Sequence, residues 1–201
     1  MNIVTDWLME IYLSFYNAIV PDRRYMAYLN GIKATLLISF FAILLGIAIG
    51  VFVAVVKVTA TESRMKWIKS VCDLYITVIR GTPLMVQLLI IYNLIFTSRN
   101  TSEIAVGAIC FGINSGAYVA EIIRAGIDSV DKGQMEAGRS LGLNYIQTMR
   151  LIIMPQAVKN ILPALGNEFI TLIKETSVAS VIAVTEVTKA AQYIGSRTYD
   201  V

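Results

Sequence analysis

Long apolar runs broken by short polar stretches dominate the pattern of hydrophobic and polar positions along this chain. The clearest run, Ala34 to Val56, carries no charge and is bracketed by Lys33 and Lys57. As a helix it is long enough to cross ~30 Å of hydrocarbon. The pattern predicts one all-α domain over 1–201, a polytopic helical bundle in a membrane. The predicted spans are about 33–57, 68–97, 104–123 and 157–175.

The segment before the first span, residues 1–29, is apolar but interrupted by Asp6 and Glu10. It lacks a basic start and a cleavage site, which argues against a signal peptide. Its aromatic residues are typical of a helix lying in the membrane interface, and for the first few residues a disordered leader fits equally well. The aromatic residues are Trp7, Tyr12, Phe15 and Tyr16.

Glycine and proline modify the first two spans. Gly46 and Gly50 form a G-x-x-x-G pattern that permits close helix contact. The sequence RGTP at 80–83 interrupts the second span and predicts a kink, because Pro83 removes a helical hydrogen bond. Arg80 then needs a polar partner or a water-filled neighbour.

Polar residues also line one face of the third span. Asn114, Tyr118 and Glu121 share this face, which should look into the bundle or a water-filled path. Arg124 follows Glu121 at i,i+3, so the two charges can pair.

The fourth span carries Asn167, Glu168, Lys174 and Glu175. Each charge at bilayer depth costs on the order of 2.5–3.5 kcal/mol, so we expect these groups to be paired or used. Glu168 and Lys174 lie roughly 120° apart around an ideal helix and ~9 Å apart along it. They converge only if the helix unwinds; otherwise they face different walls of a cavity. A purely structural alternative is that Glu175 or a partner helix neutralises Lys174.

Charge bias gives the orientation. The first loop carries four basic residues against Glu62, so we expect it inside the cell, with the N-terminus outside. The basic residues are Lys57, Arg64, Lys66 and Lys69. Two further crossings place the polar loop 124–155 on the same side.

Within that loop, EAGRSLGLNYIQTMRLIIMP predicts two short helices joined by a turn. Residues 136–138 open the first helix, and Gly142 ends it in a left-handed conformation. Asn144 caps the second helix with Gln147 in capping-box position. Pro155 ends or bends that second helix.

Composition limits the function classes. The chain is 56% hydrophobic, has no His and carries a net charge of +3, which gives nucleic-acid binding no electrostatic support. Cys72 and Cys110 are isolated, so we expect neither a disulfide nor a metal site. An intramembrane enzyme would need a nucleophile and a base, and the chain, without His, groups no such set. An ion-coupled secondary transporter should show internal repeats, and the sequence shows no repeat. Both classes are therefore disfavoured. The chain has no phosphate-binding loop for ATP.

The loop resembles the signature of membrane subunits of ATP-binding cassette importers, E-A-A, three residues, G, nine residues, I-x-L-P. The matching residues are Glu136, Ala137, Gly142, Ile152 and Pro155. Gly138 stands for the third Ala and Met154 for Leu, and we expect the geometry to survive both. The resemblance implies a type I importer permease whose loop is a coupling helix for a separate ATPase.

Two strings resemble the narrower family of polar amino-acid importers. They are RGTPLMVQLLIIYN, residues 80–93, and GNEFITLIKETSV, residues 166–178. In members that carry cationic amino acids, the matching Glu and Lys contact the substrate. That implies a site with Glu168 and Lys174, flanked by Asn167 and Glu175, for arginine, histidine or lysine; glutamine and cystine importers resemble the chain nearly as well.

The resemblance also implies the partners. These are two ATPase subunits holding ATP and Mg, a second permease copy or close relative, and an extracytoplasmic substrate-binding protein, in the bacterial inner membrane. This chain itself should bind no cofactor or metal. The family pattern continues into one more span, so we expect the sequence to be truncated.

Overall fold

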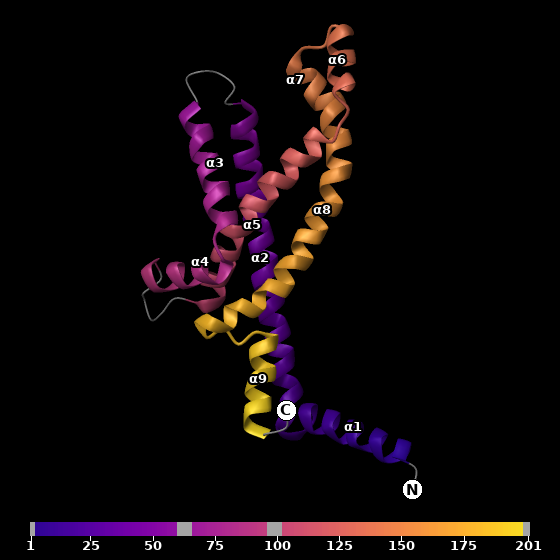
Figure 1. The fold of residues 1–201 in the computed structure, drawn as a ribbon, viewed down its shortest axis with the longest axis vertical. Coiled ribbons are helices and arrows are strands. Elements are labelled where there is room, and N and C mark those ends of the chain that lie inside the picture. Colours follow the sequence, from indigo (N-terminus) through magenta and orange to yellow (C-terminus); the bar gives the residue numbers. More distant parts are fainter. Residues whose placement is uncertain (1–2, 60–65, 96–101, 199–201) are drawn as a thin grey trace.

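The computed structural model describes residues 3–59, 66–95 and 102–198, and every regular element in these ranges is helical (Figure 1). The α-helices are α1 (Ile3–Ile19), α2 (Arg24–Thr59), α3 (Lys66–Gly81), α4 (Leu84–Ile90), α5 (Glu103–Asp128), α6 (Lys132–Ser140), α7 (Tyr145–Thr148), α8 (Met154–Glu175) and α9 (Val187–Thr198). Short 3₁₀ segments cover Pro21–Arg23 and Thr176–Ile182, and single π turns cover Ile91–Ile95 and Met149–Ile153.

Helices α2 and α5 form the centre of the bundle, and glycines set their close approach. A Cβ added to Gly46 would lie 2.8 Å from the Ser115 hydroxyl oxygen, and one on Gly50 would lie 2.5 Å from Val119 Cγ1. Gly116 on α5 faces Ile49 of α2 in the same way. The predicted close contact at the G-x-x-x-G pattern is therefore confirmed, and its partner is α5.

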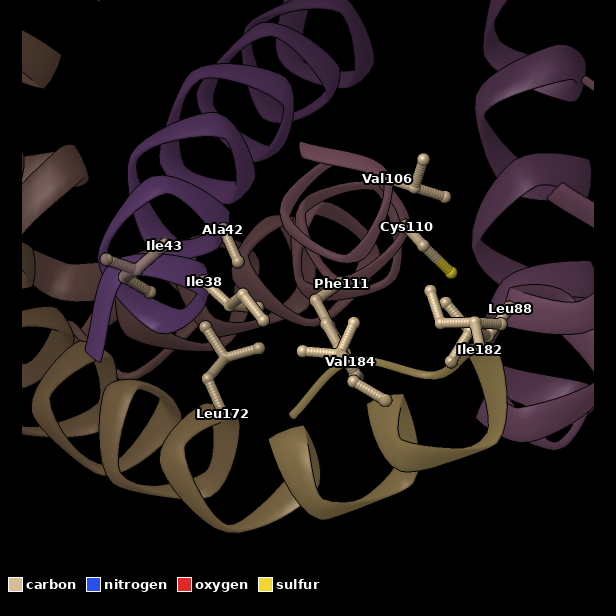
Figure 2. Packing of buried hydrophobic residues seen from close by; sticks show 11 residues of the cluster. Ile38, Ala42, Ile43, Leu88, Val106, Cys110, Phe111, Leu172, Ile182 and Val184 are labelled. Atoms are coloured by element: carbon tan, nitrogen blue, oxygen red, sulfur yellow. The ribbon is translucent and has the colours of Figure 1, made fainter. Parts of the chain in front are cut away.

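A cluster of buried apolar residues joins α2 and α5 to α4, α8 and the segment after α8. Figure 2 shows Phe111 of α5 at its centre, with Ile38 of α2 and Leu172 of α8 on one side and Leu88 of α4 on the other. All four of these side chains are buried. Since lipid is as apolar as these residues, shape complementarity holds this cluster together rather than exclusion from water.

The observed helices extend beyond two of the predicted spans. α2 begins at Arg24, upstream of the predicted 33, so residues 24–29 of the predicted interfacial segment belong to it. α5 continues to Asp128 and takes in the start of the predicted loop 124–155. Neither helix meets a breaker at the predicted boundary, so each continues past its apolar part.

The break at 80–83 is larger than the predicted kink. The chain bends by 108° between α3 and the helix that begins at Leu84, so the second helix points partly back along the first (Figure 1). Gln87 stabilises this turn, because its amide nitrogen donates to the carbonyl oxygens of Ile79, at 2.7 Å, and Thr82, at 3.1 Å. Carbonyls released by the break thus gain a side-chain partner.

By length and hydropathy, two described helices can cross a membrane, within 21–58 and 103–128, and the bent α3–α4 pair can form a third span. Helix α8 has the length but is more polar, so the predicted span 157–175 stays a prediction. The C-terminal end of α2, the start of α3 and the α6–α7 unit lie at one end of the molecule, whereas α1 and α9 lie at the other (Figure 1). This agrees with a common side for the two predicted cytoplasmic loops.

Candidate functional site: a helical elbow and a partly buried carboxylate

The elbow, defined here as α6, the turn after it and α7, is built from local hydrogen bonds. α6 begins at Lys132, with the Asp131 carboxylate accepting from the Gly133 amide at 2.7 Å. The prediction that residues 136–138 open this helix was therefore wrong; Glu136 and Ala137 lie exposed in its middle. The sequence signal was the acidic N-cap at Asp131, which satisfies the free amides of the first turn.

Gly142 ends α6 as predicted, with φ +85°. The Leu143 amide donates to the Gly138 carbonyl at 3.2 Å, and the Gly142 amide donates to the Arg139 carbonyl at 3.0 Å. This pair of bonds is a Schellman motif, in which a left-handed glycine reverses the chain after the helix. A Cβ on Gly142 would meet nothing within 4 Å, so only the backbone conformation requires glycine in the isolated chain.

The predicted capping box is confirmed. The Gln147 amide donates to Asn144 Oδ1 at 2.9 Å, and the Asn144 amide donates to Gln147 Oε1 at 2.8 Å. Pro155, by contrast, does not end the second helix. The chain continues from α7 through the π turn into α8, and Pro155 lies in the first turn of α8. A proline is tolerated there, because the preceding π turn has already shifted the hydrogen-bond register.

Gly138 is buried where α6 packs on α7. A Cβ at this position would lie 2.5 Å from Thr148 Cγ2 and 3.0 Å from Ile152 Cδ1. The departure from the third Ala of the signature therefore fits this chain, since the two elbow helices approach closely here. The outer surface of the elbow carries large apolar side chains, with Leu141 81% and Ile146 74% exposed.

Within the bundle, Ser115 and Glu168 form a hydrogen bond between α5 and α8. The fully buried Ser115 hydroxyl donates to Glu168 Oε1 at 2.7 Å. Ser115 also lies against Gly46, so the glycine-permitted approach of α2 and α5 positions the donor. Sequence analysis missed Ser115, and its small size among polar neighbours was the only signal.

Of the other predicted site residues, Lys174 and Asn167 do not share a face with Glu168, whereas Glu175 lies on nearly the same face of α8. α8 is regular from Met154 to Glu175, so it does not unwind to let Glu168 and Lys174 converge. Lys174 and Asn167 are exposed and Glu175 is partly buried. Across the described ranges Lys174 forms no ion pair with Glu175, so the alternative of neutralisation within this chain is not what the structure contains. Its place in the last turn of α8 favours a positive charge.

An ion-pair network at Glu121 joins α2, α3 and α5. Glu121 lies 2.9 Å from Arg124, as predicted, 3.7 Å from Arg80 and 3.9 Å from Lys57. Lys57 also contacts Asp73 at 2.8 Å. Glu121 is thus the polar partner that the sequence analysis required for Arg80.

The predicted polar face of α5 lies against α3 and α4, which cover part of it. Arg80 lies 5.2 Å from the centre of the Tyr118 ring, and the Asn114 amide donates to Gln87 Oε1 at 3.1 Å. Asn114 therefore looks into the bundle, one of the two predicted environments, whereas Tyr118 of the same face is exposed.

A fully buried carboxylate, Glu186, was also missed from the sequence. Glu186 is fully buried and caps α9, accepting from the amides of Thr188 and Lys189 at 2.7 Å each. α9 packs closely on α2, because a Cβ on Gly31 would lie 2.9 Å from the Val187 backbone. In the described ranges no three His, Cys, Asp or Glu side chains gather as a metal site.

Comparisons with known proteins agree with this architecture. The family described as binding-protein-dependent transport system inner membrane component matches residues 46–199. The putative glutamine transport system permease protein of Rickettsia bellii is 42% identical over 173 residues, 85% of this chain and 78% of that protein. The arginine transport system permease protein ArtQ of Bacillus subtilis is 37% identical over 187 residues, 92% of this chain and 83% of that protein.

Among solved structures, a crystal structure of an amino acid ABC transporter with histidines contains a similar chain. It is 49% identical, with a TM-score of 0.80 over 87% of this chain and 80% of that chain. The helical bundle and its elbow thus define a permease subunit of an ATP-binding cassette importer. The chain belongs to the family of inner-membrane components of binding-protein-dependent transport systems, in the branch for amino acids. It is a multi-pass transport component and not a catalyst. Systems of this family work with an ATPase and a substrate-binding protein.

Proposed function

We propose that this permease imports a cationic amino acid such as arginine, histidine or lysine. It pairs with a second copy or close relative to enclose the pathway. Two separate ATPase subunits, which hold ATP and Mg, dock on the elbow, and an extracytoplasmic binding protein delivers the substrate. ATP-driven closure of the ATPases draws the two elbows together and opens the pathway outward, and hydrolysis resets it.

The observation that carries the coupling role is the construction of the elbow. Its backbone is fixed by a Schellman motif and a capping box, while Leu141 and Ile146 stay exposed at its surface. A rigid unit with an apolar outer surface can transmit displacement to the helix it continues into. That helix is α8, because α7 runs through the π turn into it and on to Glu168.

The unpaired carboxylate of Glu168 supports a cationic substrate. Its only recorded polar contact in the described ranges is the neutral Ser115 hydroxyl, which stabilises the carboxylate without cancelling its charge. Glu175 lies on nearly the same face of α8 two turns later, since seven residues make about two helical turns. Two carboxylates on one face favour a positive side chain. Lys174 lies on a different face and suits the α-carboxylate of the substrate, as does the amide of Asn167.

The experiment compares reconstituted uptake of arginine and glutamine by the complex with Glu168→Gln. Loss of a charge-assisted hydrogen bond of ~1.5–3 kcal/mol weakens arginine binding roughly ten- to hundredfold. Glutamine uptake and basal ATP hydrolysis should stay near normal. Glu103→Gln, at the exposed start of α5, is the control. An equal fall for both amino acids would remove Glu168 from substrate selection and would favour a neutral substrate such as glutamine or cystine.

A further inference from the structure

Helix α1 is the one helix whose surface the described bundle leaves uncovered. It runs off to the side of α2, away from the rest of the molecule (Figure 1). Every side chain described from Val4 to Asn17 is exposed, including Phe15 at 68% and Trp7 at 60%. An isolated helix with this much exposed apolar area needs a covering environment.

The connection to α2 fixes the direction of α1. Asp22 and Arg23 both have positive φ, 52° and 56°, which turns the chain sharply between the two helices. A left-handed conformation is costly at a residue such as Arg23, so surrounding contacts must hold it. One such contact is the Arg24 guanidinium, which donates to the Asn17 carbonyl at the end of α1.

The two sides of α1 differ in chemistry. Its acidic and amide side chains recur at i, i+4 and i+11, which places them within about 40° of one another around the helix. These are Asp6, Glu10 and Asn17. The opposite side, centred on Leu8 and Phe15, is mainly apolar, and Trp7 lies between it and the polar stripe.

The geometry points to α1 as an interfacial anchor that lies in the outer boundary of the bilayer, with Leu8 and Phe15 toward the acyl chains and Asp6 and Glu10 toward water. The first residue of α2 lies near one end of the segment 21–58, which is long and apolar enough to cross a membrane, so α1 leaves the chain at an end of that span. In the anchor, this end lies at the level of the headgroups. There a helix can run along the surface, with its apolar side buried about 5–10 Å into the headgroup and acyl boundary. Trp7 beside the polar stripe matches the level that indole rings prefer.

The other possible cover is protein, either a second copy of the permease or the binding protein. A narrow acidic stripe flanked by a broad aromatic and aliphatic surface fits a flat boundary between water and lipid. This inference does not depend on which amino acid is carried.

Tryptophan fluorescence tests the anchor, because the chain has only two tryptophans, Trp7 and Trp67. The full chain is made with Trp7→Phe and Trp67→Phe, and one tryptophan is then restored on either side of α1. Phe15→Trp reports the apolar side, and Asn17→Trp, two residues on, reports the polar stripe. Both variants are reconstituted in phosphatidylcholine bilayers containing lipids brominated near the headgroup or near the chain end.

We expect shallow bromines to quench Phe15→Trp more than deep bromines do. The ratio of lipid to aqueous acrylamide quenching should exceed that of Asn17→Trp by about twofold or more. Equal ratios at the two positions would overturn the anchor. So would a Phe15→Trp signal that neither lipid bromines nor acrylamide reaches, since that result means protein covers this side. The parent without tryptophan must retain substrate-stimulated ATP hydrolysis with its partners, which shows that the fold survives both replacements.

Discussion

Substitutions of Gly142 can distinguish two reasons for a glycine at this position: the backbone strain that any other residue causes, and the room that the ATPase leaves for a side chain. The residue has φ +85°, and a Cβ there would meet nothing within 4 Å, so in the isolated chain any side chain costs backbone strain and nothing else. That strain is roughly 1–2 kcal/mol for an ordinary residue and smaller for Asn, which visits the left-handed region more readily. Gly142→Ala and Gly142→Arg should therefore destabilise the isolated permease by the same amount, and Gly142→Asn by less.

The affinity for the ATPase should separate Gly142→Ala from Gly142→Arg, although the two variants lose the same stability. If Gly142 seats in a cleft of the ATPase, Gly142→Ala loses at most the strain energy, about five- to thirtyfold in affinity. Gly142→Arg must also fit a long charged side chain into the cleft, so it should abolish detectable binding and transport. Thermal unfolding followed by circular dichroism gives the stability order, and retention of purified ATPase on immobilised permease gives the binding order.

The control is Ala137→Asp, which lies exposed on α6, where no left-handed backbone is involved. It should leave stability near the wild-type value and still weaken ATPase binding. If Gly142→Ala and Gly142→Arg reduce ATPase binding by one common factor, side-chain size plays no part and the seating of Gly142 is refuted. Retained uptake with Gly142→Arg would remove the coupling role of the elbow altogether.

Two further predictions concern topology and packing. Cysteines placed at Lys66 and Gln134 should react with an impermeant maleimide only from the cytoplasmic side, and one at Gln192 of α9 only from outside. The start of α3 and helix α6, which carry the first two positions, lie at the opposite end of the molecule from α9 (Figure 1). Reaction of the cysteine at 134 from outside would place the elbow on the side of the membrane that the ATPase does not reach. Gly50→Ala should lower bundle stability by about 1–3 kcal/mol, since its Cβ would lie 2.5 Å from Val119 Cγ1. Gly81→Ala, whose Cβ meets nothing within 4 Å, is the matched control in the same unfolding assay, and equal losses would contradict the close α2–α5 packing.

Local chemistry determined the parts of this protein that the sequence predicted well. These parts depend on residues a few positions apart in the chain. They are the helix end at Gly142, the Asn144–Gln147 capping box and the Glu121–Arg124 ion pair. Their geometry is set by one helical turn and needs no knowledge of the rest of the fold. The long charge-free run around Ala34–Val56 likewise predicts a span from composition alone.

Tertiary packing determined the rest. Ser115 reaches Glu168 across 53 positions, and Asn114 reaches Gln87 across 27, so each pair depends on which helices lie side by side. Pro155 does not end the second helix, because a proline also fits the first turn of a helix and the π turn before it makes Pro155 part of the first turn of α8. The sequence by itself determined the long apolar span, the helix end at Gly142, the Asn144 cap and the family. Only the packing of α5 against α2, α4 and α8 decided which polar groups are paired, and it left the Glu168 carboxylate without a cation in the described chain.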